Sequence, residues 1–177
     1  MFIKSFSKIS KKDVKEAGGK GASLGEMTRA KISVPPGFVV LASAFQRFLE
    51  ETDLEVEIRS ILDKEVKIKD IGSVEKASEK IRDLVMDMDF PKDIGEEINK
   101  EFKKLKDKYV AVRSSATAED SSEASWAGEL ETYLNTEVKD LLNNVKKSWS
   151  SLFTPRAIFY RYEKKLYKKK VSVEAVV

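Results

Sequence analysis

A short alternation of apolar residues that ends in an arginine constrains this chain more than any other segment. It covers residues 109–120 and reads Tyr-Val-Ala-Val-Arg-Ser-Ser-Ala-Thr-Ala-Glu-Asp. In a strand, successive side chains point to opposite faces, so Val110 and Val112 share one face while Arg113 lies on the other. The segment therefore predicts a strand that delivers one fixed cation to a loop rich in hydroxyls and acids.

Arg113 is suited to phosphate groups, because a guanidinium is always charged and presents a rigid fork of donors. Ser114, Ser115 and Thr117 add hydroxyl and backbone donors nearby. An exposed strand end followed by a polar turn accounts for the same residues. The residue types alone favour this plainer interpretation, since Ser, Thr and Asp are ordinary in loops.

Lys20 lies among glycines, in the stretch Gly18-Gly19-Lys20-Gly21. Glycines let a ligand approach the backbone closely. A lysine near a helix N-terminus opposes the helix dipole, so its place there is favourable if an anion lies between it and the exposed amides. The stretch lacks the spacing of a P-loop. A glycine-rich turn with a solvated lysine is the interpretation that these residues alone favour.

Composition excludes several kinds of chemistry. The chain has 177 residues, 41% of them hydrophobic, which is enough for one ordinary domain or two small lobes. It contains no cysteine and no histidine, so it has no disulfide, no thiolate site and no histidine base. Its 33 basic and 30 acidic residues are interspersed, which argues against a nucleic-acid partner. No apolar run reaches the roughly 20 residues that span a bilayer, so we expect a cytoplasmic protein without a membrane partner.

The hydrophobic pattern predicts an α+β fold in two parts. Residues 1–108 are expected to form a helix-rich N-terminal lobe with the Gly-Lys turn, and residues 109–177 a lobe of helices and small mixed sheet that is truncated at its C-terminal end. The first part should hold a short helix at 22–29, a strand at 38–41 and three later helices. The stripes that predict these helices are Phe45, Phe48 and Leu49, then Ile81, Leu84, Val85 and Met88, and after Pro91 the residues Ile94, Ile98, Phe102 and Leu105.

The second part begins with a strand at 110–114, a loop at 115–128 and a partner strand at 130–135. A long amphipathic helix should follow. Thr154 is the expected N-cap of the next helix, with Pro155 at its first position. Residues 171–177 predict a strand in a buried sheet, and because the chain stops inside it we expect a fragment of a longer protein.

Five segments together resemble one known family. They are Gly18 to Met27, Val34 to Val40, Val110 to Asp120, Ala124 to Gly128 with Glu131 and Thr132, and Ser148 to Phe153 with Arg156 and Ala157. In order and spacing they resemble the N-terminal ATP-binding region shared by phosphoenolpyruvate synthase, pyruvate phosphate dikinase and rifampicin phosphotransferase. The run after Val112 favours the synthase and the rifampicin enzyme over the dikinase.

By this resemblance the fold is the N-terminal portion of an ATP-grasp nucleotide-binding domain. Lys20 matches the family's lysine that contacts the ATP phosphates. Arg113 matches the arginine that holds the transferring phosphoryl groups, so it is the expected catalytic residue. The segment from Ser121 to Gly128 matches the loop that covers the triphosphate. Thr132 is a further expected contact, although a strand residue with an outward hydroxyl explains it equally well.

The implied reaction converts ATP, pyruvate and water into AMP, phosphoenolpyruvate and phosphate through a phosphohistidine. Because the chain has no histidine, we expect that group and the pyruvate site on remaining domains or a split subunit, and this fragment alone to be inactive. Mg²⁺ ligands are also expected downstream, with Glu119, Asp120 and Glu123 as loop or partner-lobe residues. The alternatives are an antibiotic phosphotransferase of the rifampicin type and a binding module that has lost catalysis.

Overall fold

One five-stranded sheet organises the residues that the computed structural model describes, which are 1–116, 131–167 and 172–177. In spatial order its strands are β1 (Ile3–Ser5), β2 (Phe38–Val40), β5 (Val173–Val176), β3 (Val110–Ala116) and β4 (Thr132–Thr136). Each strand runs antiparallel to its neighbours. The sheet is therefore built from segments far apart in the sequence.

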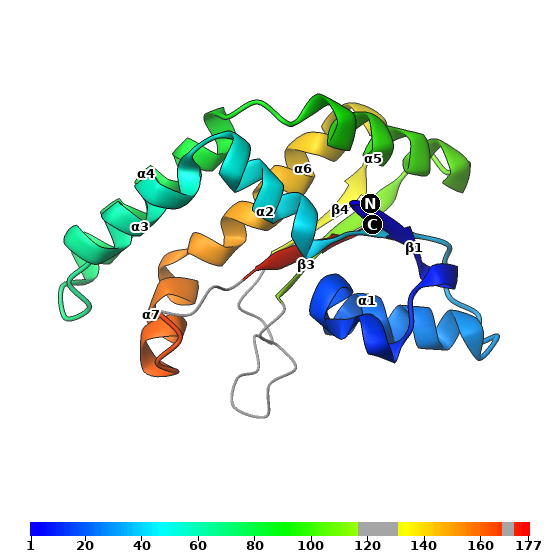
Figure 1. Ribbon diagram of the computed structural model, residues 1–177, viewed down its shortest axis with the longest axis horizontal. Helices are drawn as coiled ribbons and strands as arrows, with labels where there is room; N and C mark the ends of the chain where they lie inside the picture. The colour runs from blue at the N-terminus through cyan, green and yellow to red at the C-terminus, as the bar shows by residue number, and fades with distance from the viewer. Residues whose placement is uncertain (117–130, 168–171) are drawn as a thin grey trace.

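Helices cover the two sides of this sheet unequally. They are α1 (Val14–Arg29), α2 (Ala42–Glu51), α3 (Leu54–Lys64), α4 (Ile71–Asp87), α5 (Lys92–Leu105), α6 (Val138–Ser150) and α7 (Pro155–Glu163). Short 3-10 helices cover Phe6–Lys8, Lys11–Asp13 and Ser151–Phe153. In Figure 1, α1 lies on one side of the sheet, and α2, α4, α5 and α6 lie on the other.

The two faces of the sheet pack against two apolar clusters. Because side chains alternate along a strand, Val39 faces α1 whereas the residues on either side of it face the other helices. The cluster on the α1 face is small. The larger one centres on Trp149, which is fully buried. Its ring centroid lies 5.5, 5.3 and 5.1 Å from those of Phe45, Phe48 and Phe90.

The predicted α+β class is confirmed, and so are most of the predicted elements. The strand at 38–41, the helix after Pro91 and the cap of α7 are present, and Thr154 Oγ1 accepts a hydrogen bond from Ala157 N at 3.2 Å. The prediction omits β1, which has three residues, and α3. The mixed sheet is wrong for the described strands, because β5 runs against both of its neighbours.

Strands from both predicted parts share the sheet. β1 and β2 come from residues 1–108, while β3, β4 and β5 come from residues 109–177. The division near residue 109 stays a prediction. The strands of the two predicted parts are joined by β5, which lies between β2 and β3 and pairs with both.

α1 is kinked at Gly18, whose φ of 65° and ψ of 170° are not helical. The sequence predicts a turn at 18–21 before a short helix, but helical geometry resumes directly after Gly18 and includes Lys20. The glycines suit a helix here because α1 lies close to the sheet: a Cβ at Gly21 would be 2.8 Å from Val39 Cγ2. Lys20 therefore lies in the first helical turn after the kink.

Gly18 has no room for a side chain, since a Cβ there would collide with the Glu174 carboxylate and the Ser115 hydroxyl. Its backbone conformation is also one that other residues avoid. We expect Gly18→Ala to lower the free energy of unfolding by about 2 kcal/mol or more, measured by urea denaturation. Gly72→Ala in α4 is the control, because its Cβ would meet only Asp70 Oδ1 at 3.4 Å. If the two variants lose the same free energy of unfolding, the kink at Gly18 does not require glycine.

Asp13 ties the start of α1 to β1. Lys4 Nζ donates a hydrogen bond to Asp13 Oδ1 at 2.9 Å, and Ser10 donates to Asp13 Oδ2 through its backbone N at 2.9 Å and its hydroxyl at 2.8 Å. The bond from Lys4, followed by those from Ser10, lowers the pKa of Asp13 from 3.8 to about 2. Because the folded state has the lower pKa, this stabilisation is complete above about pH 4 and is lost as the pH falls through about 2.

We expect Asp13→Asn to lower the free energy of unfolding by about 1 kcal/mol near neutral pH, since it removes the ion pair with Lys4 and weakens the capping box of the 3-10 helix Lys11–Asp13. The difference between wild type and variant should shrink as the pH falls from about 5 to 2. Urea denaturation at a series of pH values measures it. A difference that stays constant over this range would show that the Asp13 charge contributes nothing.

Candidate functional site

Arg113 and Thr132 lie opposite each other on neighbouring strands. Their Cα atoms are register partners in β3 and β4, and across β5 Arg113 is the partner of Val176. Directly opposite residues point to the same face of a sheet, and Val176 belongs to the cluster beneath α1. Arg113 and Thr132 therefore both project from the α1 face, where both are exposed.

Lys20 approaches the same strand from α1. Its Nζ donates a hydrogen bond to the backbone oxygen of Ser114 at 3.1 Å, across a separation of 94 positions in the sequence. Ser114 directly follows Arg113, so the lysine is held beside the strand that carries the arginine. The structure thus brings together Lys20, Arg113 and Thr132, three residues that the sequence singles out.

Ser114 is the point where these elements meet. Its backbone N and its hydroxyl both donate to the backbone oxygen of Glu131, at 3.2 and 2.7 Å. Its own carbonyl accepts the bond from Lys20. Because its donors and its acceptor are engaged on different elements, Ser114 fixes β3 relative to α1 and to the residue that precedes β4.

Two buried polar residues lie beside the kink of α1: Ser115, which the sequence offers as a donor near Arg113, and Glu174, which sequence reasoning missed. Ser115 and Glu174 are register partners on β3 and β5, and each has 0% exposure. Both lie against Gly18. The available signal is the position of Glu174, an acid inside the apolar run at 171–177. A carboxylate is costly to bury, so this small polar region beside Lys20 is a specific feature of the α1 face.

The geometry suits a chain of phosphate groups. A lysine ammonium acts as a point charge, whereas the planar fork of an arginine can bind two phosphate oxygens at once. Lys20 also lies near the start of a helical segment, where the helix dipole favours an anion. The exposed hydroxyl of Thr132, on the same face as Arg113, adds a neutral donor.

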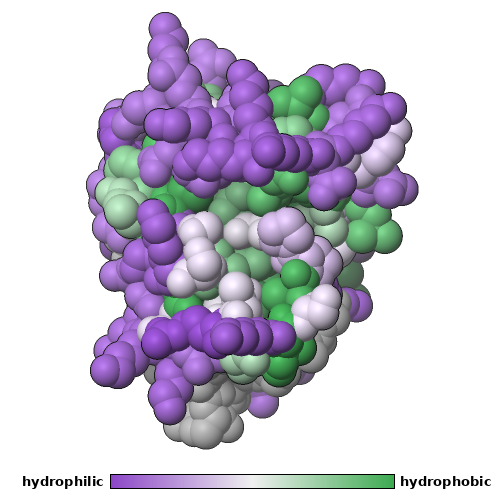
Figure 2. Space-filling view, turned by 90° about the vertical axis from the view of Figure 1, so that its right-hand side faces the viewer, coloured by the Kyte–Doolittle hydropathy of each residue, from purple (hydrophilic) through white to green (hydrophobic). Residues whose placement is uncertain are grey.

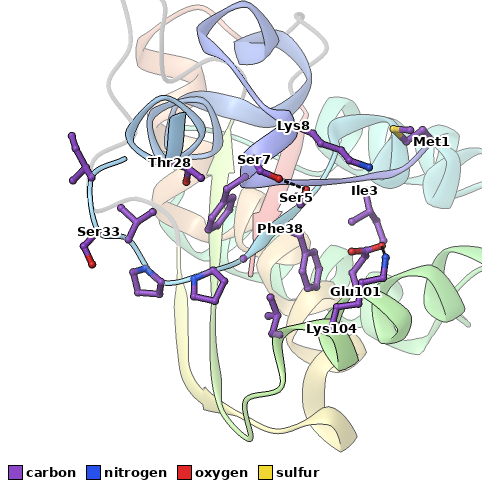
Figure 3. Close-up of a pocket in the computed structure, with 17 residues that line it drawn as sticks. Met1, Ile3, Ser5, Ser7, Lys8, Thr28, Ser33, Phe38, Glu101 and Lys104 are labelled. Atoms are coloured by element: carbon purple, nitrogen blue, oxygen red, sulfur yellow. Dashed lines mark hydrogen bonds and ion pairs between the residues drawn. The ribbon is translucent and has the colours of Figure 1, made fainter. Parts of the chain in front are cut away.

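A separate cavity of about 530 Å³ lies beside Ser5 and Phe38, at the end of the strands away from Ser115. Figure 2 shows an apolar area between hydrophilic side chains on this side of the molecule. Figure 3 shows the lining residues, among which Lys104 Nζ is paired with Glu101 Oε1 at 2.5 Å. The residues of the cationic site do not line this cavity, so the two places are distinct.

Several predicted residues lie outside the described part of the chain. They are Ser121 and Gly128, with Glu119, Asp120 and Glu123. Within the described ranges, no three acidic side chains come close enough together to hold a metal ion. None of the helices in those ranges combines the length and the apolar character needed to cross a bilayer.

Comparison with known proteins gives a consistent result over nearly the whole chain. Residues 14–177 match the family model described as pyruvate phosphate dikinase, AMP/ATP-binding domain. A probable phosphoenolpyruvate synthase of Methanocaldococcus jannaschii is 46% identical over 183 residues, which cover 99% of this chain and 15% of that protein. The phosphoenolpyruvate synthase of Pyrococcus furiosus is 40% identical over 214 residues, which cover 99% of this chain and 26% of that protein.

A probable phosphoenolpyruvate synthase of Archaeoglobus fulgidus is 46% identical over 175 residues, which cover 96% of this chain and 23% of the relative. The chain thus spans about a quarter or less of the length of these three relatives. Since the family model covers all but the first 13 residues, the chain belongs to the pyruvate phosphate dikinase AMP/ATP-binding domain family.

Proposed function

We propose that this chain is the ATP-binding part of a phosphoenolpyruvate synthase and holds the ATP phosphates between Lys20 and Arg113. The observation that carries the proposal is the bond from Lys20 Nζ to the Ser114 oxygen at 3.1 Å, which fixes one cation beside the strand that carries the other. Family membership and the names of the similar proteins support it.

Each residue has a distinct role in this proposal. Lys20 contacts phosphate oxygens as a point charge, and Arg113 holds the phosphoryl groups during transfer. Thr132 donates its hydroxyl from the strand opposite Arg113. Ser121 and Gly128 belong to a segment that covers the triphosphate. Phosphoryl transfer depends mainly on positioning and on electrostatic stabilisation, so fixed cations are the groups that such a site requires.

For the whole protein we propose the reaction of ATP, pyruvate and water to AMP, phosphoenolpyruvate and phosphate. A phosphohistidine would carry the phosphoryl group between the two substrates. This chain has no histidine, so the phosphohistidine and the pyruvate site would belong to other domains or another subunit, and this chain alone would not complete the reaction. The share of the relatives' length that lies outside the match leaves room for such domains.

Mg²⁺ is the proposed metal partner of the bound ATP, because a divalent cation neutralises phosphate charge in this class of reaction. We place its protein ligands in the polypeptide downstream of this segment. The proposed location is the cytoplasm, where ATP and pyruvate are available, and no nucleic-acid or membrane partner is proposed. The interspersed charges of the chain agree with this assignment.

The rifampicin-type phosphotransferase is not favoured, because the similar proteins described above are named phosphoenolpyruvate synthases. A binding module without catalysis would share the fold but would not require both cations. The Lys20 ammonium, held by Ser114 against the strand that carries Arg113, therefore favours the catalytic assignment.

Calorimetric titration with a magnesium complex of a non-hydrolysable ATP analogue tests the site. We expect Lys20→Ala and Arg113→Ala each to raise the Kd about tenfold or more, because each removes a charged contact to phosphate.

Lys15→Ala and Arg29→Ala are matched controls. Both residues are exposed on α1, and the two substitutions remove one lysine charge and one arginine charge, as Lys20→Ala and Arg113→Ala do. Their Kd values should stay near that of the wild type. If Lys20→Ala and Arg113→Ala bind the analogue as the wild type does, the proposed site is wrong.

A further inference from the structure

Glu131 is held from the face of the sheet opposite the cationic site. Arg82 of α4 donates from one guanidinium nitrogen to its two carboxylate oxygens, at 3.4 and 3.5 Å. The hydroxyl of Tyr133 donates to Glu131 Oε2. Tyr133 is the register partner of Val112, whose side chain lies in the larger apolar cluster. The Arg82, Glu131 and Tyr133 cluster therefore lies on the side of the sheet that faces α4.

Burial, followed by the bond to Glu131, raises the pKa of Tyr133 well above its usual value. The phenol thus remains protonated and available as a donor near neutral pH. Tyr133 also contacts a cation, since Lys147 Nζ lies 5.7 Å from the centre of its ring. The Arg82, Glu131 and Tyr133 cluster lines a pocket of about 540 Å³ together with Lys147.

The main chain of Glu131 connects this cluster to the candidate phosphate site. Its carbonyl accepts two hydrogen bonds from Ser114, whose own carbonyl accepts the bond from Lys20. A continuous series of polar contacts therefore runs from Arg82 on α4 through Glu131 and Ser114 to Lys20 on α1. It crosses the sheet at Ser114 and Glu131, which are the chain neighbours of Arg113 and Thr132.

We propose that Arg82 is a positioning residue for the phosphate site, acting through Glu131 and Ser114. This proposal rests on the proposed function, because the effect of Arg82 is measured through the binding of ATP. By holding the Glu131 carboxylate, Arg82 fixes the Glu131 carbonyl under the Ser114 amide and hydroxyl. This sets the position of Arg113 and Thr132 relative to Lys20 without any contact between Arg82 and the phosphates.

The ion pair itself contributes little to folding, because both side chains are about one third exposed, at 33% and 37%. Positioning can nevertheless change binding, since phosphate contacts depend on the separation of the groups that make them. Arg82→Ala should therefore weaken ATP binding more than it weakens the fold. A purely structural role would affect the fold first.

The test compares Arg82→Ala with Lys80→Ala, which removes another α4 cation whose partner, Glu65, lies 2.7 Å away. Calorimetry measures the Kd for the ATP analogue, and urea denaturation measures the folded state. We expect the Kd of Arg82→Ala to rise about threefold or more, with a denaturation midpoint like that of Lys80→Ala. Arg82→Lys, which keeps the charge, should recover part of the affinity.

Two further readouts separate this proposal from the site assignment. In Arg82→Ala the amide proton of Ser114 should exchange with solvent faster than in the wild type and in Lys80→Ala. In an Arg82→Ala, Arg113→Ala double variant the two losses of affinity should not add, because Arg82 acts through the placement of Arg113.

A Kd for Arg82→Ala equal to that of Lys80→Ala would overturn the positioning role, while losses in Lys20→Ala and Arg113→Ala would leave the proposed function intact. If the wild type binds no ATP analogue, the proposed function fails. The Ser114 exchange rate then decides alone: faster exchange in Arg82→Ala supports the series of contacts, and an unchanged rate overturns it.

Discussion

The insertion of β5 between β2 and β3 is the constraint on which the rest of the structure depends. Val176 pairs with Val39 on one side and with Arg113 on the other, so three segments distant in sequence become adjacent strands. α1 packs on the face that includes Val39 and Val176. Without that pairing, Lys20 would have no strand to approach and the two cations would not share a face of the sheet.

The two faces of the sheet differ in what they contribute. The face under α2 to α7 holds most of the apolar core around Trp149, which stabilises the sheet. The α1 face combines a small apolar cluster with the exposed Arg113, the half-buried Lys20 and the buried Glu174. Polar side chains can gather there because the other face supplies the greater part of the hydrophobic burial.

Local patterns in the sequence predict local structure well. Thr154 before Pro155 identifies the start of α7, and the alternation around Val112 identifies β3. Contacts between distant segments are not encoded in such patterns, so the pairing of Ser115 with Glu174 could not be predicted. The turn expected around Lys20 is wrong because tertiary packing on the sheet overrides the low helix propensity of glycine.

The candidate residues depend on a different kind of inference. Lys20, Arg113 and Thr132 come from the resemblance, and the structure places them on one face, but their contacts with ATP stay a proposal. Ser114 and Glu131 belong to the segments that carry the resemblance, but their residue types alone do not indicate that they position other groups. Their importance follows from the bonds that they make to other elements, which only the assembled fold provides.

Amide chemical shifts recorded by nuclear magnetic resonance during addition of ATP test the Lys20 and Arg113 site directly, because they map the bound phosphates onto the chain. We expect the largest changes at the amides of residues 19–21, Arg113 and Thr132. The cavity beside Phe38 and Leu105 should show small changes or none. Changes concentrated at that cavity, with residues 19–21 and Arg113 unaffected, would show that the phosphates do not bind between Lys20 and Arg113.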